Sequence, residues 1–270
     1  MGTKQKRTIL LLICMAAFCL AGSILLNGAK PRTESIKQVM RDAVLHDTGR
    51  INILGIKDVN PAFVSAFVVM IAILLIAAGI RIFVIPRFRY VPGKFQLVLE
   101  EWVSFFDNLA ISNSPHRNGF LGAYIFAAGS YIFISTLFEL LGLQAITTEG
   151  HSITLPAPLS DINAAIALGC LSYLIILSGG IAGNGVKGIG KTIKEFSLPV
   201  SMSFRLFGAL LSGLLVTELV YFFINLSFVL PVAVAIMFTL LHALIQTYVL
   251  TLLTSIFYGE VSEPAPKHSK

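Results

Sequence analysis

Charged residues are scarce in this chain. Only 13% of its 270 residues are Asp, Glu, Lys or Arg, whereas 56% are hydrophobic and the mean hydropathy is +0.83. About a quarter of the residues of a soluble domain are charged. The composition therefore excludes an ordinary soluble enzyme and indicates an integral membrane protein.

Cysteine is rare too. The three cysteines, Cys14, Cys19 and Cys170, lie in apolar segments without CxxC spacing, so we interpret them as small lipid-facing or core residues. The net charge of +6 would suggest nucleic acid as a partner of a soluble protein. Here most Lys and Arg flank apolar runs, as the positive-inside bias of membrane proteins requires, and no nucleic-acid partner is expected.

Apolar runs divide the chain into membrane spans. The first, residues 8–26, follows a basic start and has the arrangement of a signal peptide or signal anchor; no clear cleavage site closes it, which favours an anchor, with cleavage as the alternative. The other runs are 61–86, 119–143, about 162–182, 198–225 and about 229–258. We therefore expect an all-α, polytopic membrane protein with five or six transmembrane helices in one membrane domain, residues 1–270.

Basic residues orient these spans. With the N-terminus inside, 13 of the 20 Lys and Arg lie on the cytoplasmic side, six lie outside in residues 28–60, and Arg205 lies within the membrane.

Between the second and third spans, an apolar stripe that includes Phe95, Trp102 and Leu109 opposes a polar face with Glu100 and Asp107. This pattern predicts an amphipathic helix at the membrane interface.

Arg205 is the residue that most needs an explanation. A charge at the centre of a bilayer costs from about 3 to more than 10 kcal/mol, depending on snorkelling and water. Arginine stays protonated, so it acts as a fixed positive charge whose natural partner is a carboxylate. No acid lies three or four residues away, and Glu218 is roughly 220° around the helix and some 20 Å along it. The alternative is a structural Arg bonded to backbone carbonyls.

Other polar residues in or beside the spans are further candidates. Glu139 lies near the end of the third span, and Asp161 and Asn163 lie at the start of the fourth. An N-cap role would explain Asp161 equally well. His242 and Gln246 are four residues apart and share a helix face; an interhelical hydrogen-bonded pair is the alternative for them.

Residues 185–192, GVKGIGKT, match the phosphate-binding P-loop pattern. A working P-loop joins a strand to a helix in an α/β domain and needs a Mg²⁺-binding acid elsewhere. Here a membrane span precedes the motif and another follows shortly after it. We therefore interpret this stretch as a glycine-rich basic connector, and we expect no bound nucleotide.

Two strings, PVSMSFRLFGALLSG around Arg205 and IQTYVLTLLTSIFY around Gln246, resemble subunit a of the F-type rotary ATP synthase. PVSMSFRLFGALLSG resembles the family's P-[IV]-S-L-S-x-R-L-F-G-N element around its essential arginine, which corresponds to Arg205. IQTYVLTLLTSIFY resembles the family's glutamine-containing element and places Gln246 at that glutamine. VPGKFQLVLEEWVSFFDNL, STLFELLGL and PAPLSDINAAIAL are similar to three more family segments, in the family's order. The similar core covers residues 61–258.

The resemblance implies a function and a set of partners. It implies a non-catalytic stator subunit with a long C-terminal helical hairpin facing the c-subunit ring, attached to the b-subunit stalk and the rest of the complex. Two half-channels would carry H⁺ or Na⁺ to and from the ring carboxylates, with no cofactor besides the transported ion. Arg205 would separate the half-channels, and Glu139 and Asp161 are candidates for the outer one. A bacterial plasma membrane is the expected location.

The chain also departs from the family pattern. Ala209 replaces the usual Asn, and Leu214 and Thr239 replace residues that are often Glu or His. We hypothesise that Glu218 and His242, one helical turn further along, take over these roles. A secondary transporter acting alone is the alternative function, but it predicts internal repeats, and the sequence shows none.

The relocation hypothesis makes a direct prediction. We expect Glu218→Gln to lower ATP-driven ion pumping by the reconstituted complex, because the substitution removes the only acid of the fifth span. Unchanged pumping would show that Glu218 has not taken over the role of the missing group.

Overall fold

The computed structural model describes residues 37, 51–53, 56–146, 152–222 and 230–264; within these ranges, the side chains of residues 52, 53, 56–58, 214, 217, 218, 220–222 and 230–235 are not described. The long helices are α3 (Pro61–Gly79), α4 (Lys94–Asn113), α5 (Gly119–Leu137), α6 (Ile162–Asn184), α7 (Val186–Lys194), α8 (Ser197–Phe222) and α9 (Leu230–Ser262). A π-helical turn, η1 (Ile80–Val84), and short 3₁₀ turns, η2 (Ile85–Arg87), η3 (Phe138–Leu141) and η4 (Pro158–Ser160), extend or precede them.

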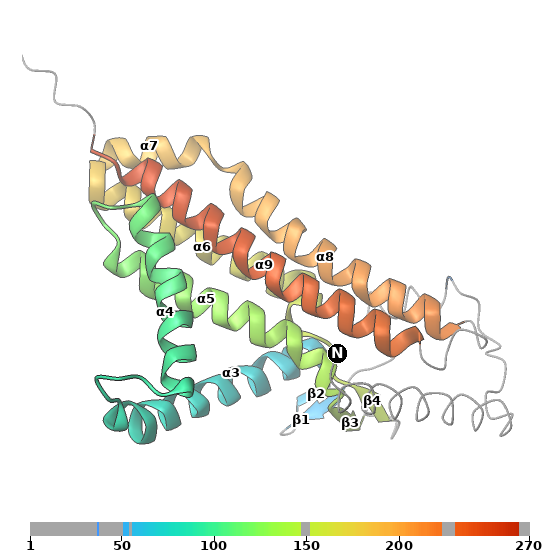
Figure 1. Cartoon of the computed structure of the whole chain (residues 1–270). Coiled ribbons are helices and arrows are strands. Elements are labelled where there is room, and N and C mark those ends of the chain that lie inside the picture. The colour runs from blue at the N-terminus through green and yellow to red at the C-terminus, as the bar shows by residue number, and fades with distance from the viewer. Residues whose placement is uncertain (1–36, 38–50, 54–55, 147–151, 223–229, 265–270) are drawn as a thin grey trace, which may run out of the picture.

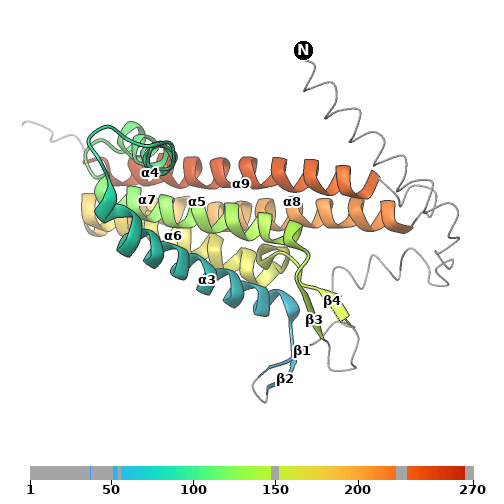
Figure 2. The same ribbon diagram turned by 60° about the horizontal axis from the view of Figure 1, so that its bottom comes forward.

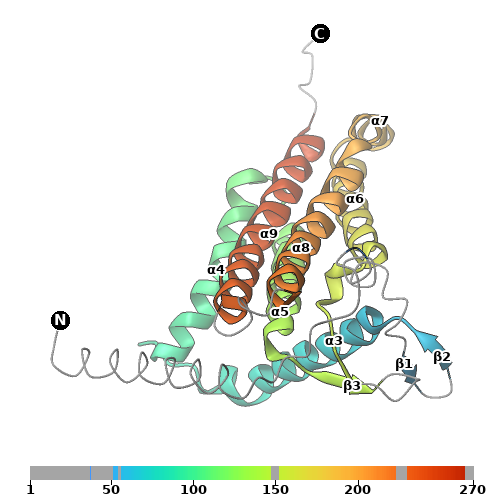
Figure 3. The ribbon, with the colours of Figure 1, turned by 90° about the vertical axis from the view of Figure 1, so that its right-hand side faces the viewer.

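Helices α5, α6, α8 and α9 form the central bundle (Figure 1). Helix α4 crosses this direction steeply and appears nearly end-on where the bundle runs across the view (Figure 2). Helix α8 lies beside α9, with α4 on the α9 side and α6 on the α8 side (Figure 3). Two small antiparallel hairpins, β1 (Ile51–Ile53) with β2 (Ile56–Val59) and β3 (Gln144–Ile146) with β4 (Ser152–Thr154), were not predicted from the sequence.

Most of the predicted spans are confirmed as helices. Among the described residues, four helical segments are long and apolar enough to cross a membrane: Pro61–Arg87, Gly119–Leu141, Ile162–Asn184 and Ile236–Ser262. The fifth predicted span is helix α8, of which some side chains are not described. The predicted span at residues 8–26 lies outside the described residues.

The connector at residues 185–192 begins with a glycine turn. Gly185 has φ 58°, in the left-handed region where glycine carries no steric cost, and it ends α6. The following residues form helix α7. Because a helix precedes the GVKGIGKT motif, the strand that a P-loop requires is not there.

The ends of the helices separate basic from acidic segments. At one end, Asn184 Nδ2 donates to Val261 O (2.9 Å) and His116 Nε2 lies 2.8 Å from Ser262 Oγ, which ties α6 and the α4–α5 loop to the end of α9. The basic residues of this end include Arg87, Arg117, Lys187, Lys191 and Lys194. The opposite connection, residues 138–161, contains neither Lys nor Arg. By the positive-inside bias, this asymmetry is the basis of the predicted orientation, with the basic end in the cytoplasm. We call the opposite end the outer end.

Glycines let the helices approach closely. A Cβ at Gly129 of α5 would overlap the Phe106 ring and lie 3.1 Å from Thr251 Cγ2 of α9. A Cβ at Gly169 of α6 would lie 2.9 Å from Pro199 O of α8. Backbone contact of this kind is typical of helix pairs in membranes, and it fixes the helices in one register.

This packing predicts a stability difference between two glycines. We expect Gly129→Ala to lower the free energy of unfolding by about 1–3 kcal/mol, because the added methyl group overpacks the contact with Phe106 and Thr251. Unfolding in mixed detergent micelles would measure it. Gly190→Ala is the matched control, since no atom lies within 4 Å of its added Cβ. Equal effects of the two substitutions would contradict the packing described here.

Candidate functional site

Arg205 lies on the outward face of α8. Its side chain is exposed, whereas the next residue, Leu206, is 1% exposed and packs in the bundle core. Ser201, Gly208 and Ser212 are also exposed and lie on the same helix face as Arg205. Within the described part of the chain, Arg205 makes no ion pair or hydrogen bond. A fixed positive charge thus stands on a face of small residues.

His242 packs against α8. A Cβ at Gly213 would lie 3.3 Å from His242 Nδ1, so these two helices touch at this level. Because α8 and α9 run antiparallel, one turn toward the basic end brings Ala209 level with Gln246, and the next turn reaches Arg205. Each step is about 5.4 Å. His242 and Gln246 therefore both lie on the outer side of Arg205.

Gln246 belongs to a buried polar stripe on α9. It is 5% exposed, while His242, on the same face, is half-buried. Below Gln246, Thr247 Oγ1 lies 3.5 Å from Gly129 O, and Thr251 Oγ1 donates to Thr247 O at 2.7 Å. Further along, Thr254 Oγ1 is buried without a partner among the described residues. The stripe connects the level of Gln246 with the basic end of α9.

Glu139 lies at the outer end of α5. It is half-buried in the first turn of η3, which contacts α9. The close contact of Gly129 with Thr251 sets the register of α5 against α9. Ten residues further toward the outer end on both helices, Glu139 reaches approximately the level of His242. The two residues thus come from different helices to a similar depth.

Asp161 is the N-cap of α6, which confirms the alternative that the sequence left open. Its Oδ1 accepts a hydrogen bond of 2.7 Å from the backbone N–H of Asn163, whose side chain is exposed. Its Oδ2 accepts a hydrogen bond from Asn60 Nδ2. Leu159, two residues earlier, is 1% exposed and packs in one cluster with Leu206 and Leu210 of α8. The loop that carries Asp161 therefore rests on the turn of α8 next to Arg205.

The structure brings most of the predicted residues to the outer side of Arg205, on different helices. Glu218 lies in α8, but its side chain is outside the described residues, so its relocated role stays a prediction. Asn60 was not predicted; its signal was an Asn directly before a Pro at a helix start, which is typical of an N-cap. Among the described residues, no three His, Cys, Asp or Glu side chains come together as metal ligands.

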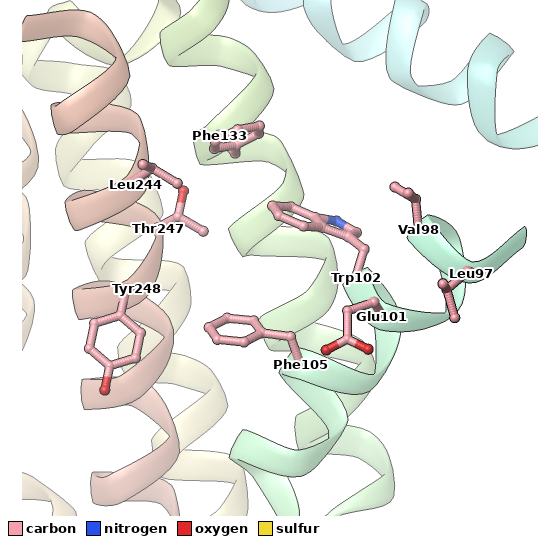
Figure 4. Close-up of a pocket in the computed structure, with 9 residues that line it drawn as sticks. All are labelled: Leu97, Val98, Glu101, Trp102, Phe105, Phe133, Leu244, Thr247 and Tyr248. Carbon is pink, nitrogen blue, oxygen red and sulfur yellow. The ribbon is translucent and has the colours of Figure 1, made fainter. Parts of the chain in front are cut away.

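A separate cleft of about 770 Å³ opens between α4, α5 and α9 (Figure 4). Its lining is mostly apolar and aromatic, and Glu101 is its only charged residue: Leu97, Val98, Glu101, Trp102, Phe105, Phe133, Leu244, Thr247 and Tyr248. None of the predicted site residues lines it. The cleft shares Thr247 with the polar stripe of α9.

Comparisons with known proteins identify the family to which this chain is similar. The family model described as ATP synthase A chain matches residues 62–259. ATP synthase subunit a of Cereibacter sphaeroides (strain ATCC 17025 / ATH 2.4.3) is 29% identical over 199 residues, which cover 69% of this chain and 76% of the relative. ATP synthase subunit a of Beijerinckia indica subsp. indica is 25% identical over 226 residues, 76% of this chain and 87% of the relative. ATP synthase subunit a of Histophilus somni (strain 2336) is 27% identical over 199 residues, which cover 62% of this chain and 73% of the relative.

The register of α8 against α9 can be tested by cross-linking. In a background without the native cysteines, we expect Gly213→Cys with His242→Cys to form a disulfide rapidly under mild oxidation, because the two positions are in contact. Mass spectrometry of the linked peptides would detect it. The control pair, Gly208→Cys with His242→Cys, is displaced by about 7.5 Å along α8. Equally fast linkage of the control would mean that the register is wrong.

Proposed function

The chain belongs to the ATP synthase A chain family and is a multi-pass membrane subunit, the ion-translocating stator of an F-type ATP synthase; on that premise we propose that Arg205 separates two half-channels. The observation that carries this proposal is the exposed guanidinium on α8, which has no acidic partner among the described residues. Its carboxylate partner comes from another chain.

The partner we propose is the ring of c subunits, each with a carboxylate inside the membrane. Ser201, Gly208 and Ser212 surround Arg205 on its face, and a Cβ at Gly208 would meet no atom within 4 Å. Small side chains allow another helix to approach the guanidinium closely. Arg205 then attracts each passing carboxylate in its ionised form and prevents the ion from crossing directly between the half-channels.

The outer half-channel runs, in this proposal, along residues on the outer side of Arg205. Asp161 and Asn163 lie at the start of α6, Glu139 at the end of α5, and His242 and Gln246 on α9. Their carboxylate, amide and imidazole groups can accept hydrogen bonds or protons in an otherwise apolar bundle. An ion entering from outside meets them before it reaches the ring.

The remaining features of the proposal concern the complex. The chain itself catalyses no reaction and binds no cofactor besides the transported H⁺ or Na⁺; ATP is made by the catalytic head. Further partners are the b-subunit stalk and the rest of the synthase, in a bacterial plasma membrane. A secondary transporter is the rival function, and it would move its solute without any other subunit.

The test is ATP-driven ion uptake by vesicles that contain the whole complex. We expect Arg205→Ala to lower uptake by at least about a hundredfold, because a preorganised charge at the reacting group is lost. Arg87→Ala, at the exposed end of η2, is the control and should pump normally. Dependence of the wild type on Na⁺ identifies the ion. Normal uptake by Arg205→Ala would overturn the proposal.

A further inference from the structure

Asn60 and Asp161 join the starts of two helices that are distant in the sequence. Asn60 Oδ1 accepts a 2.9 Å hydrogen bond from the backbone N–H of Ala62 and so caps α3, while its Nδ2 donates to Asp161 Oδ2. Asp161 Oδ1 caps α6. Each side chain therefore uses one atom for its own helix and the other for its partner, 101 residues away.

The contact lies where α3 meets the bundle. The buried residues of α3 are all in its first half: Pro61, Ala62, Ser65 and Val69. Most of the rest of the helix is exposed. The Asn60–Asp161 hydrogen bond is thus one of the contacts that hold α3 against the bundle. It also orients the carboxylate at the start of α6.

The same contact reaches toward Arg205. Asp161 follows η4 directly, and Leu159 of η4 packs with Leu206 and Leu210 of α8. A displacement of Asp161 would therefore also displace the turn of α8 beside Arg205, because a close-packed core transmits displacement. Asn60 and Asp161 could each cap their own helix without touching one another. The hydrogen bond between them is therefore not needed for capping.

We propose that Asn60 is a positioning residue of the outer half-channel: its amide holds the carboxylate of Asp161 in place for the passing ion. The inference rests on the proposed function, because it takes Asp161 as part of that channel. Asn60 itself exchanges no ion. It acts through one donated hydrogen bond, which orients the carboxylate and leaves the cap of α6 intact.

Single substitutions can break this contact without removing either cap. In Asn60→Asp, the new carboxylate still caps α3, but two acceptors face each other. In Asp161→Asn, the new amide still caps α6, but two donors face each other. The double variant, Asn60→Asp with Asp161→Asn, faces a donor with an acceptor again, in the reverse direction. A carboxylate is favourable at either helix N-terminus, so the exchange costs neither helix its cap.

We measure ATP-driven uptake in vesicles of the whole complex, per assembled complex. We expect Asn60→Asp to lower uptake about tenfold, because the Asp161 carboxylate loses the donor that orients it. Asp161→Asn and the double variant lack that carboxylate, so both should stay at least about tenfold below the wild type. Wild-type uptake in either single variant would overturn the proposal. So would wild-type uptake in the double variant, whose carboxylate lies on residue 60 instead of residue 161.

Controls separate positioning from charge and from assembly. Gln144→Glu adds the same charge on β3 at the outer end and keeps the oxygen that accepts from Ser152; we expect normal uptake, and a loss equal to that of Asn60→Asp would overturn the proposal. Asn60→Ser keeps a cap without a donor in reach. It replaces Asn60→Asp if that variant fails to assemble, and unchanged uptake in it would equally overturn the proposal.

Arg205→Ala in the same vesicles keeps the two proposals apart. Normal uptake by Arg205→Ala would overturn the proposed function itself. A loss in Arg205→Ala together with normal uptake in Asn60→Asp would overturn only the role of Asn60.

Discussion

A positive charge without an internal partner is the constraint on which this structure depends. Leu206 and Leu210 bury one face of α8 in the bundle, and this turns Arg205 outward among small residues. No carboxylate of the described residues approaches it. A guanidinium in a membrane without a counter-charge is costly, and this cost is the reason for our proposal that another subunit supplies the carboxylate.

The register of the helices determines what lies on each side of that charge. Gly129, Gly169 and Gly213 bring helices into direct contact at three places. A slip of one turn would move a helix by about 5.4 Å and carry His242 or Glu139 past the level of its neighbours. Close glycine packing and polar end contacts, such as Asn184 with Val261, work against such a slip. The proposed ion path thus depends on packing as much as on polar residues.

Hydropathy predicted most of the helices because the bilayer sets the length of an apolar run. It could not predict partners. Asn60 meets Asp161 across 101 residues, and the contact of Gly213 with His242 depends on how two helices pack, which no local pattern encodes. The sequence indicated a glycine-rich connector at residues 185–192 but not that it is helical, because glycine is a poor helix former. The cost of a charge in an apolar span singled out Arg205, and the family resemblance added a role for it and for Gln246. Their different surroundings, exposed and buried, came only from the fold.

The most direct test of Arg205 as the separator is passive ion flow through vesicles stripped of the catalytic head, with the ring cross-linked so that it cannot rotate. We expect no flow in the wild type, because the fixed charge closes the direct route, and measurable flow in Arg205→Ala, where the two half-channels are no longer separated. Equal tightness of both preparations would contradict the separation of the half-channels by this residue.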